Sequence, residues 1–100
     1  MATFREEYAD IAGRLADLFA ESTPELLESL RSAQDAGDEE GLRRAAHKLK
    51  GSCLNIGATL MATLAASVEQ GEDTGKAIAE LEAAFEPTRA ALRDALGTAS

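Results

Sequence analysis

The sequence contains very little of what several classes of protein require. It has one cysteine, Cys53, and one histidine, His47, so it can form neither an intrachain disulfide nor a standard zinc cluster. No apolar run is long enough to span a bilayer, and the first ten residues show no apolar core of a secretory signal. We therefore expect a reduced, cytoplasmic setting, no bound metal and no contact with a membrane.

Aromatic and basic residues are also scarce. Tryptophan is absent and aromatic residues make up 4% of the chain, so the core must be built from aliphatic side chains, a composition typical of helical proteins. The 10 Lys and Arg residues against 18 Asp and Glu give a formal net charge of −8, which suits neither nucleic acid nor an anionic membrane. The length allows one domain, and we expect residues 1–100 to form it.

Apolar residues recur at intervals of three and four, which predicts four amphipathic helices. The first is expected over about residues 5–36 with a kink near Pro24, because its apolar stripe keeps one phase across that proline. The other helices are expected over about residues 39–56, 58–70 and 74–96, followed by a frayed tail at 97–100. The short turns between them favour an all-α fold, an antiparallel, up-and-down four-helix bundle.

Each predicted helix has a stripe of residues that we expect to face the core. The first stripe is Tyr8, Ile11, Leu15, Leu18, Phe19, Leu26, Leu27, Leu30 and Ala33. The second is Leu42, Ala45, Ala46, Leu49, Cys53 and Ile56. The third is Leu60, Leu64 and Val68, and the fourth is Ile78, Leu81, Phe85, Thr88, Leu92 and Leu96. Asp38 is predicted to cap the second helix and Gly57 to end it, while Pro87 should bend the last one.

The second stripe determines where His47 points. At about 100° per residue, His47 lies roughly 140° from the mean direction of that stripe, which predicts a surface position. A neutral imidazole is a nucleophile near neutral pH, so an exposed histidine can carry a phosphoryl group. Lys50 at i+3, and Arg43 at i−4, are placed to hold the negative charge that this group would bring.

The residues around His47 are unusual as a set, although any one of them alone is more often an ordinary surface residue. Gly51 costs a helix about 1 kcal/mol relative to Ala, but it would let a partner come close to the imidazole, and Ser52 continues the small surface. Leu54 is an apolar residue predicted to be exposed, suited to partner docking. Arg44 and Lys48 add positive charge that could steer an acidic partner toward the histidine.

These residues resemble the signature of histidine-containing phosphotransfer (HPt) domains, written H-x-x-K-G-[ST]-x-x-x-x-G-[AL]. The matching positions in AAHKLKGSCLNIGA (45–58) are His47, Lys50, Gly51, Ser52, Gly57 and Ala58, and the resemblance extends over roughly residues 15–72. It implies a phosphorelay intermediate. His47 would accept a phosphoryl group, on Nε2 in this family, from the aspartyl phosphate of a response-regulator receiver domain, or from a hybrid or sensor histidine kinase. It would then pass the group to another receiver aspartate.

The resemblance also implies that the chain is a carrier without an ATP site or a cofactor of its own, since the receiver partner would supply Mg²⁺. The sequence agrees in having no Gly-rich phosphate loop. The chemotaxis-kinase version of the domain tends to keep an acidic partner for its histidine. Here no acidic residue follows His47 within one turn, and Glu40 is two turns before it, which favours the phosphorelay type.

Two other interpretations remain open at this point. A helical adaptor could bind receiver or kinase domains and never carry phosphate. A metal-binding bundle is disfavoured, because such bundles use inward-facing Glu-x-x-His pairs whereas His47 is the only histidine and points outward. We expect a free-standing monomer, in which the inward-facing Cys53 belongs to the core.

Overall fold

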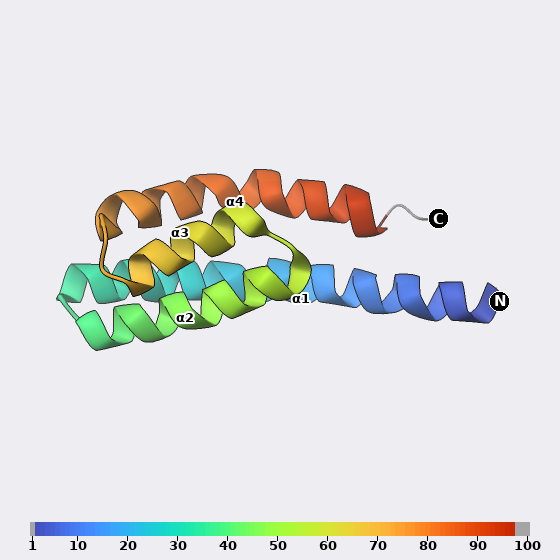
Figure 1. Ribbon diagram of the computed structural model, residues 1–100, viewed down its shortest axis with the longest axis horizontal. Coiled ribbons are helices and arrows are strands. Elements are labelled where there is room, and N and C mark those ends of the chain that lie inside the picture. Colours follow the sequence, from blue (N-terminus) through green and yellow to red (C-terminus); the bar gives the residue numbers. More distant parts are fainter. Residues whose placement is uncertain (1, 98–100) are drawn as a thin grey trace.

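The computed structural model describes the backbone of residues 2–97, and the side chains of residues 11 and 13–95. This part of the chain forms four helices and no strand: α1 (Ala2–Ala36), α2 (Glu39–Ile56), α3 (Thr59–Glu69) and α4 (Thr74–Gly97). Successive helices run in opposite directions, and α4 closes the bundle by packing against both α3 and α1 (Figure 1). The predicted antiparallel, up-and-down bundle is therefore confirmed.

The helix boundaries differ little from those predicted. α1 begins at Ala2 rather than near residue 5, and it continues as one helix through Pro24, as α4 does through Pro87. The kink and the bend expected at these two residues stay predictions. Gly97 is the last residue of α4, and the remainder of the predicted tail lies outside the described residues, as do the side chains of Tyr8 and Leu96.

The two ends of α2 are fixed by the residues that the sequence indicated. The Asp38 side chain accepts a hydrogen bond of 3.0 Å from the backbone N–H of Gly41, as an N-cap does. At the other end Gly57 takes the left-handed conformation, with φ of 79°, and the N–H of Ala58 donates to the carbonyl of Cys53 at 2.8 Å. This tight turn sends the chain back as α3, directly alongside α2.

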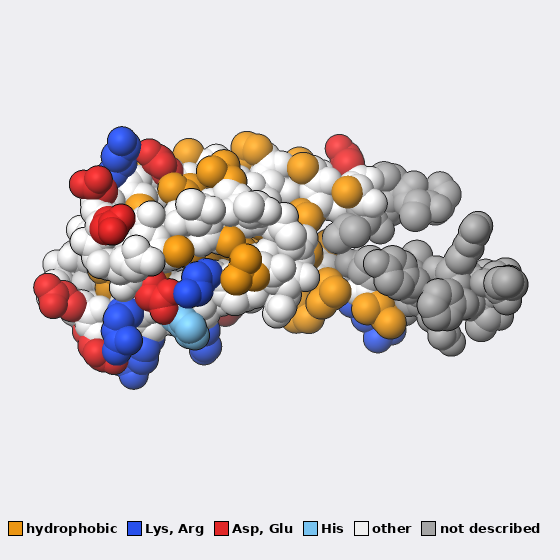
Figure 2. Space-filling view, viewed as in Figure 1, with side chains coloured by type: hydrophobic (Ala, Val, Ile, Leu, Met, Phe, Trp, Pro, Cys, Tyr) orange, Lys and Arg blue, Asp and Glu red, His pale blue; other side chains and the backbone are white. Residues whose placement is uncertain are grey.

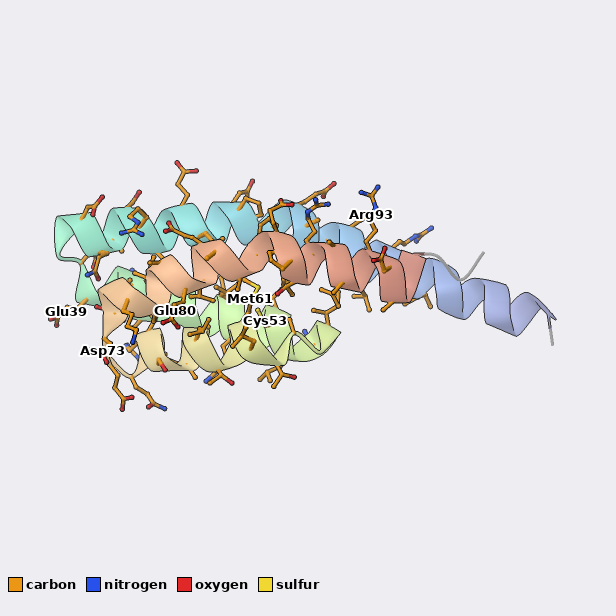
Figure 3. All side chains as sticks on the ribbon, turned by 90° about the horizontal axis from the view of Figure 1, so that it is seen from above. Glu39, Cys53, Met61, Asp73, Glu80 and Arg93 are labelled. Carbon is orange, nitrogen blue, oxygen red and sulfur yellow. The ribbon has the colours of Figure 1, made fainter. Side chains whose placement is uncertain are left out.

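The predicted inner face of α2 is confirmed. Leu42, Ala45, Ala46, Leu49 and Cys53 are all buried, and Ile56 packs against them while remaining partly exposed. Figure 3 shows Cys53 and Met61 inside the bundle, and burial raises the pKa of the Cys53 thiol to about 11. Because five inner residues fix the rotation of α2, they also determine which of its residues face solvent.

The predicted stripes of the other helices are confirmed only in part. In α3 the buried side chains are Met61, Ala62, Ala65 and Val68, whereas Leu60 is 64% exposed. In α1, Phe19, Leu27 and Leu30 are buried, but Ile11, Leu15 and Leu18 are largely exposed. Leu15 and Leu18 lie at the edge of the contact between α1 and α2, where they line an open hollow with α2 residues such as Ser52 and Ile56. Further toward its N-terminus, α1 continues past the turn between α2 and α3 (Figure 1).

Thr23 is a polar residue inside the core. Its side chain is fully buried beside Pro24, and its hydroxyl oxygen has no hydrogen-bond partner. A buried hydroxyl without a partner has lost its hydrogen bonds to water and gained none in return. We found no structural reason for a threonine here.

We therefore expect Thr23→Val, which keeps the side-chain shape, to raise the free energy of unfolding by about 1–2 kcal/mol. Urea denaturation followed by circular dichroism measures this change. Thr63→Val is the matched control, because the exposed Thr63 hydroxyl bonds to the carbonyl of Thr59, and its loss should change stability by less than about 0.5 kcal/mol. A stability loss in Thr23→Val would show that the hydroxyl has a partner.

Candidate functional site

His47 lies at the molecular surface, as its position on α2 predicts. Its neighbours Ala46 and Leu49 are fully buried, which places the imidazole on the outer side of the helix, with 69% of its side chain exposed. Figure 2 shows the ring at the surface, with basic side chains close by. A partner protein can reach this imidazole without any rearrangement of the bundle.

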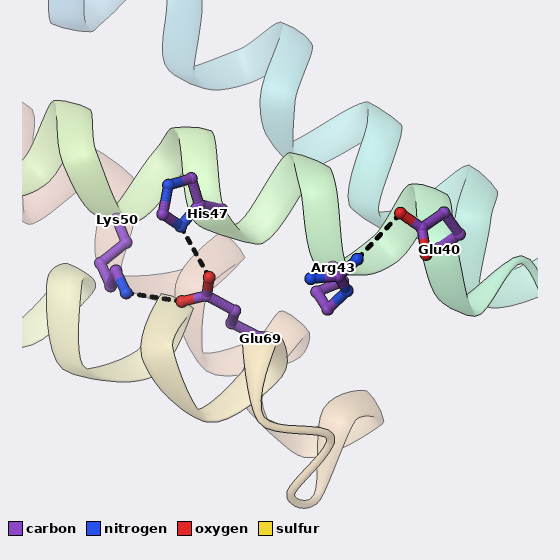
Figure 4. Close-up of polar contacts among 5 residues, drawn as sticks. All are labelled: Glu40, Arg43, His47, Lys50 and Glu69. Atoms are coloured by element: carbon purple, nitrogen blue, oxygen red, sulfur yellow. Dashed lines mark hydrogen bonds and ion pairs between the residues drawn. The ribbon is translucent and has the colours of Figure 1, made fainter.

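A carboxylate from α3 contacts both His47 and Lys50 of α2. One oxygen of Glu69 lies 2.6 Å from Nδ1 of His47, and its other oxygen accepts a hydrogen bond of 2.6 Å from the ammonium group of Lys50 (Figure 4). The Glu69 side chain is only 20% exposed. A single, largely shielded carboxylate therefore bridges the imidazole and the nearest lysine.

This bridge determines which nitrogen of His47 is free. The hydrogen bond from Lys50, together with that from His47, lowers the pKa of the Glu69 carboxyl below its usual value. Glu69 is therefore ionised near neutral pH and can only accept hydrogen bonds, so Nδ1 must carry the proton. In the neutral ring Nε2 then keeps its lone pair, and it is the nitrogen that can attack an electrophile.

The other residues predicted for the site lie around the histidine in different ways. Lys50 is 30% exposed and touches Glu69, whereas Arg43 pairs with Glu40 at 2.9 Å. A Cβ atom at Gly51 would meet no atom within 4 Å, so the surface beside the imidazole is open, and Ser52 is partly exposed. The docking candidates Leu54, Arg44 and Lys48 are all exposed.

The main residue of the candidate site that the sequence did not reveal is Glu69. No acidic residue of α2 lies within one turn after His47, but an acidic partner comes from α3, 22 residues further along the chain. The preference for the phosphorelay type on the ground that such a residue was absent was therefore wrong in its premise. One signal was available, because Glu69 is the only charged residue of α3.

No group of three or more histidine, cysteine or acidic side chains is arranged to hold a metal ion among the side chains that the structure describes. Within the same part of the chain, no helix combines the length and the apolar character that crossing a membrane requires.

Comparison with known proteins agrees with this geometry. The model of the Hpt domain family matches residues 14–97. Among solved structures, the histidine-containing phosphotransfer protein B (HptB) from Pseudomonas aeruginosa PAO1 superposes with a TM-score of 0.85 and 28% sequence identity, covering 99% of this chain and 91% of that one. No curated protein sequence matches the chain.

The chain therefore belongs to the Hpt domain family, since the family model matches most of its length. The family and the likeness to HptB give it a histidine phosphotransfer role in phosphorelays, working with receiver domains and histidine kinases. The family match and the likeness to HptB therefore support the phosphorelay type, whereas the supposed absence of an acidic partner does not.

The bridge predicts how Glu69 titrates. Its pKa should lie below the usual value for a glutamate, and Lys50→Ala should raise it, as measured by ¹³C NMR of the carboxyl group. Arg43→Ala is the matched control, because it removes a neighbouring cation that pairs with Glu40, and it should leave the Glu69 pKa unchanged.

Glu69 should also make the stability of the fold depend on pH. A carboxyl whose pKa is lower in the folded state stabilises the fold above the unfolded pKa, and this contribution is lost as the pH falls through the folded pKa. Glu69→Gln should therefore weaken the loss of stability in acid. If Lys50→Ala left the Glu69 pKa where it was, the bridge would not exist in solution.

Proposed function

We propose that His47 is the residue that carries the phosphoryl group, and that it does so on Nε2. The observation that supports this most is the Glu69 bridge, which binds Nδ1 of an exposed imidazole and leaves Nε2 with its lone pair toward solvent. A nucleophile held in one tautomer by a carboxylate is a common arrangement in group transfer. Glu69 acts here as a positioning residue, because it touches the imidazole on the side away from the reaction.

The proposed transfer step forms one bond to phosphorus and breaks another. Nε2 of His47 attacks the phosphorus of a receiver aspartyl phosphate, the bond from phosphorus to the aspartate oxygen breaks, and the aspartate leaves as a carboxylate. The proton on Nδ1 stays in its hydrogen bond with Glu69, so no proton has to leave or enter. The reverse step passes the phosphoryl group to the next receiver aspartate by the same route.

The cations near His47 divide into two roles in this proposal. Lys50 is the nearest, and it can turn from Glu69 toward the phosphoryl oxygens. Arg43 is second, because it lies four residues before His47 and pairs with Glu40. Arg44 and Lys48 are exposed and form no phosphoryl contact in this scheme. They favour the approach of the acidic, Mg²⁺-binding pocket of a receiver.

The remaining chemistry belongs to the partners. We include in the proposal that this chain is a monomeric carrier without an ATP site, so a kinase or a phosphorylated receiver must supply the phosphoryl group. The absence of a Gly-rich phosphate loop from the sequence supports this. Gly51 and Ser52 keep the surface beside the imidazole low, which lets the receiver bring its aspartate within reach.

His47→Gln should abolish phosphorylation. The wild-type chain, incubated with ³²P-labelled receiver domains or cognate kinase, should acquire a label that is lost in acid and kept in alkali, as expected for phosphohistidine. Label is measured after gel electrophoresis, and circular dichroism confirms that the variant is folded. The substituted side chain is 69% exposed, so the fold should not change.

Retention of the label by His47→Gln would refute the assignment. Binding of receiver domains to the wild-type chain without any label transfer, across all receivers tested, would instead favour the helical adaptor.

Two substitutions of Gly51 should separate its effect on the approach of a receiver to His47 from its effect on the stability of the fold. Gly51→Ala should stabilise the fold by about 1 kcal/mol, because the added methyl group meets no neighbour and alanine favours the helix. Gly51→Leu should also fold well, but it should slow phosphoryl transfer at least tenfold by filling the space beside His47.

Transfer reactions quenched at fixed times measure the rate of phosphoryl transfer, and thermal unfolding measures the stability. Gly75→Leu is the matched control, since Gly75 is another exposed helical glycine, a Cβ there would make only an ordinary contact of 3.7 Å with Gln34, and Gly75 lines no hollow with His47. Unchanged transfer by Gly51→Leu would mean that the receiver does not pass over this position.

A further inference from the structure

The ammonium group of Lys50 is already paired before any phosphoryl group arrives. Lys50 lies one turn after His47 on α2, and its Nζ donates to one oxygen of Glu69, whose other oxygen contacts Nδ1 of His47 (Figure 4). Both members of this ion pair are only partly exposed, whereas the carboxylates that pair with Arg31 and Arg89 are exposed. Water and salt therefore weaken the attraction between Lys50 and Glu69 less than they weaken those other pairs.

A phosphoryl group on Nε2 of His47 would compete with Glu69 for this ammonium group. A phosphoryl group brings about two negative charges, and nearby cations bind its oxygens by charge-assisted hydrogen bonds. The ammonium group has three N–H donors, but a carboxylate drawn to the same cation as the phosphoryl oxygens would repel them. Each of the two anions therefore weakens the binding of Lys50 to the other.

The two hydrogen bonds of Glu69 have different consequences for phosphoryl transfer. The bond to Nδ1 fixes the ring of His47 and leaves Nε2 free to react. The bond from Lys50 keeps the nearest cation away from the phosphoryl oxygens. Orientation of the ring alone could be provided by a neutral glutamine, whose amide oxygen accepts a hydrogen bond and whose NH₂ group cannot accept one from Lys50. A carboxylate at this position therefore does more than orient the ring.

From this geometry we infer that Glu69 sets the equilibrium of phosphoryl transfer. By pairing with Lys50, it weakens the binding of the phosphoryl group on His47 and shifts the equilibrium toward the aspartyl phosphate of the receiver. In this step the bond from Nε2 to phosphorus forms, the bond from phosphorus to the aspartate oxygen breaks, and the aspartate leaves as a carboxylate. Glu69 and Lys50 exchange no proton in it. The inference rests on the proposed function, since it takes Nε2 of His47 as the atom that carries the group.

The test is a double-mutant cycle on Glu69 and Lys50. The equilibrium constant for transfer from a receiver to this chain is measured from the partition of ³²P label between the two proteins in the presence of Mg²⁺. Glu69→Gln should raise this constant about tenfold, because it frees Lys50 and also removes a negative charge near the phosphoryl group. When Lys50→Met is already present, Glu69→Gln should raise the constant by less than about threefold, because only the removal of the charge remains.

Equal effects of Glu69→Gln with and without Lys50→Met would overturn the inference, because Glu69 would then act without Lys50. Glu82→Gln is the matched control. It removes the same charge from the ion pair with Arg31, and neither of these residues lines a hollow that includes His47. It should change the equilibrium constant by less than about twofold. A change as large as that of Glu69→Gln would show that net charge, not the bridge, sets the equilibrium.

Glu69→Ala covers the case in which the glutamine amide turns its oxygen toward Lys50. Alanine cannot bind Lys50 in any orientation, so Lys50→Met should lower the equilibrium constant about fivefold more in Glu69→Ala than in the wild-type chain. ¹⁵N spectra of the His47 imidazole show which nitrogen carries the proton in each variant, which separates a change of tautomer from a change in phosphoryl binding. Circular dichroism confirms that the variants are folded. An equal effect of Lys50→Met in the two chains would also overturn the inference.

The failure of this inference can be distinguished from that of the proposed function. If His47→Gln keeps its label, or if no receiver labels the wild-type chain, the proposed function fails and the inference about Glu69 falls with it. If the wild-type chain is labelled on His47 but the cycle shows no coupling between Glu69 and Lys50, only the inference about Glu69 fails.

Discussion

The arrangement of the site depends on one carboxylate that joins two helices. Glu69 of α3 accepts hydrogen bonds from both His47 and Lys50 of α2, each at 2.6 Å. Without it, the imidazole would be a surface side chain free to turn and to exchange its proton between two nitrogens. The carboxylate fixes the orientation of the ring, its tautomer and the position of the nearest ammonium group at once, which is why a small bundle can present a defined nucleophile.

The bridge in turn depends on how closely α2 and α3 are joined. Gly57 ends α2 in a left-handed conformation and α3 begins two residues later, at Thr59, so the two helices form a tight antiparallel pair. The small buried residues Ala62 and Ala65 allow α3 to pack closely on α2. Glu69, at the end of α3, is thereby carried back along α2 to the level of His47 and Lys50.

Much of the fold could be predicted from the sequence, because the caps and the stripe of α2 are local signals. Asp38, Gly57 and the apolar residues between them gave the helix, its rotation and the exposure of His47. The stripe of α1 was misleading, since helical spacing shows which residues share a face but not where a neighbouring helix packs against that face. Leu15 and Leu18 have the right spacing for a core but lie at the open edge of the contact with α2. Glu69 was missed because a contact between helices is not visible in the spacing of either one.

The shared carboxylate also bears on how firmly a phosphoryl group would be held. Lys50 is already paired with Glu69, so phosphoryl oxygens would have to compete with a carboxylate for its ammonium group. An unpaired lysine at this position would stabilise the phosphorylated state more and would make the group harder to release. A carrier has to accept and to give up the same group, and neither step should be strongly favoured by its own residues. In the proposed function, the bridge would thus position the nucleophile while limiting how strongly Lys50 holds the phosphoryl group.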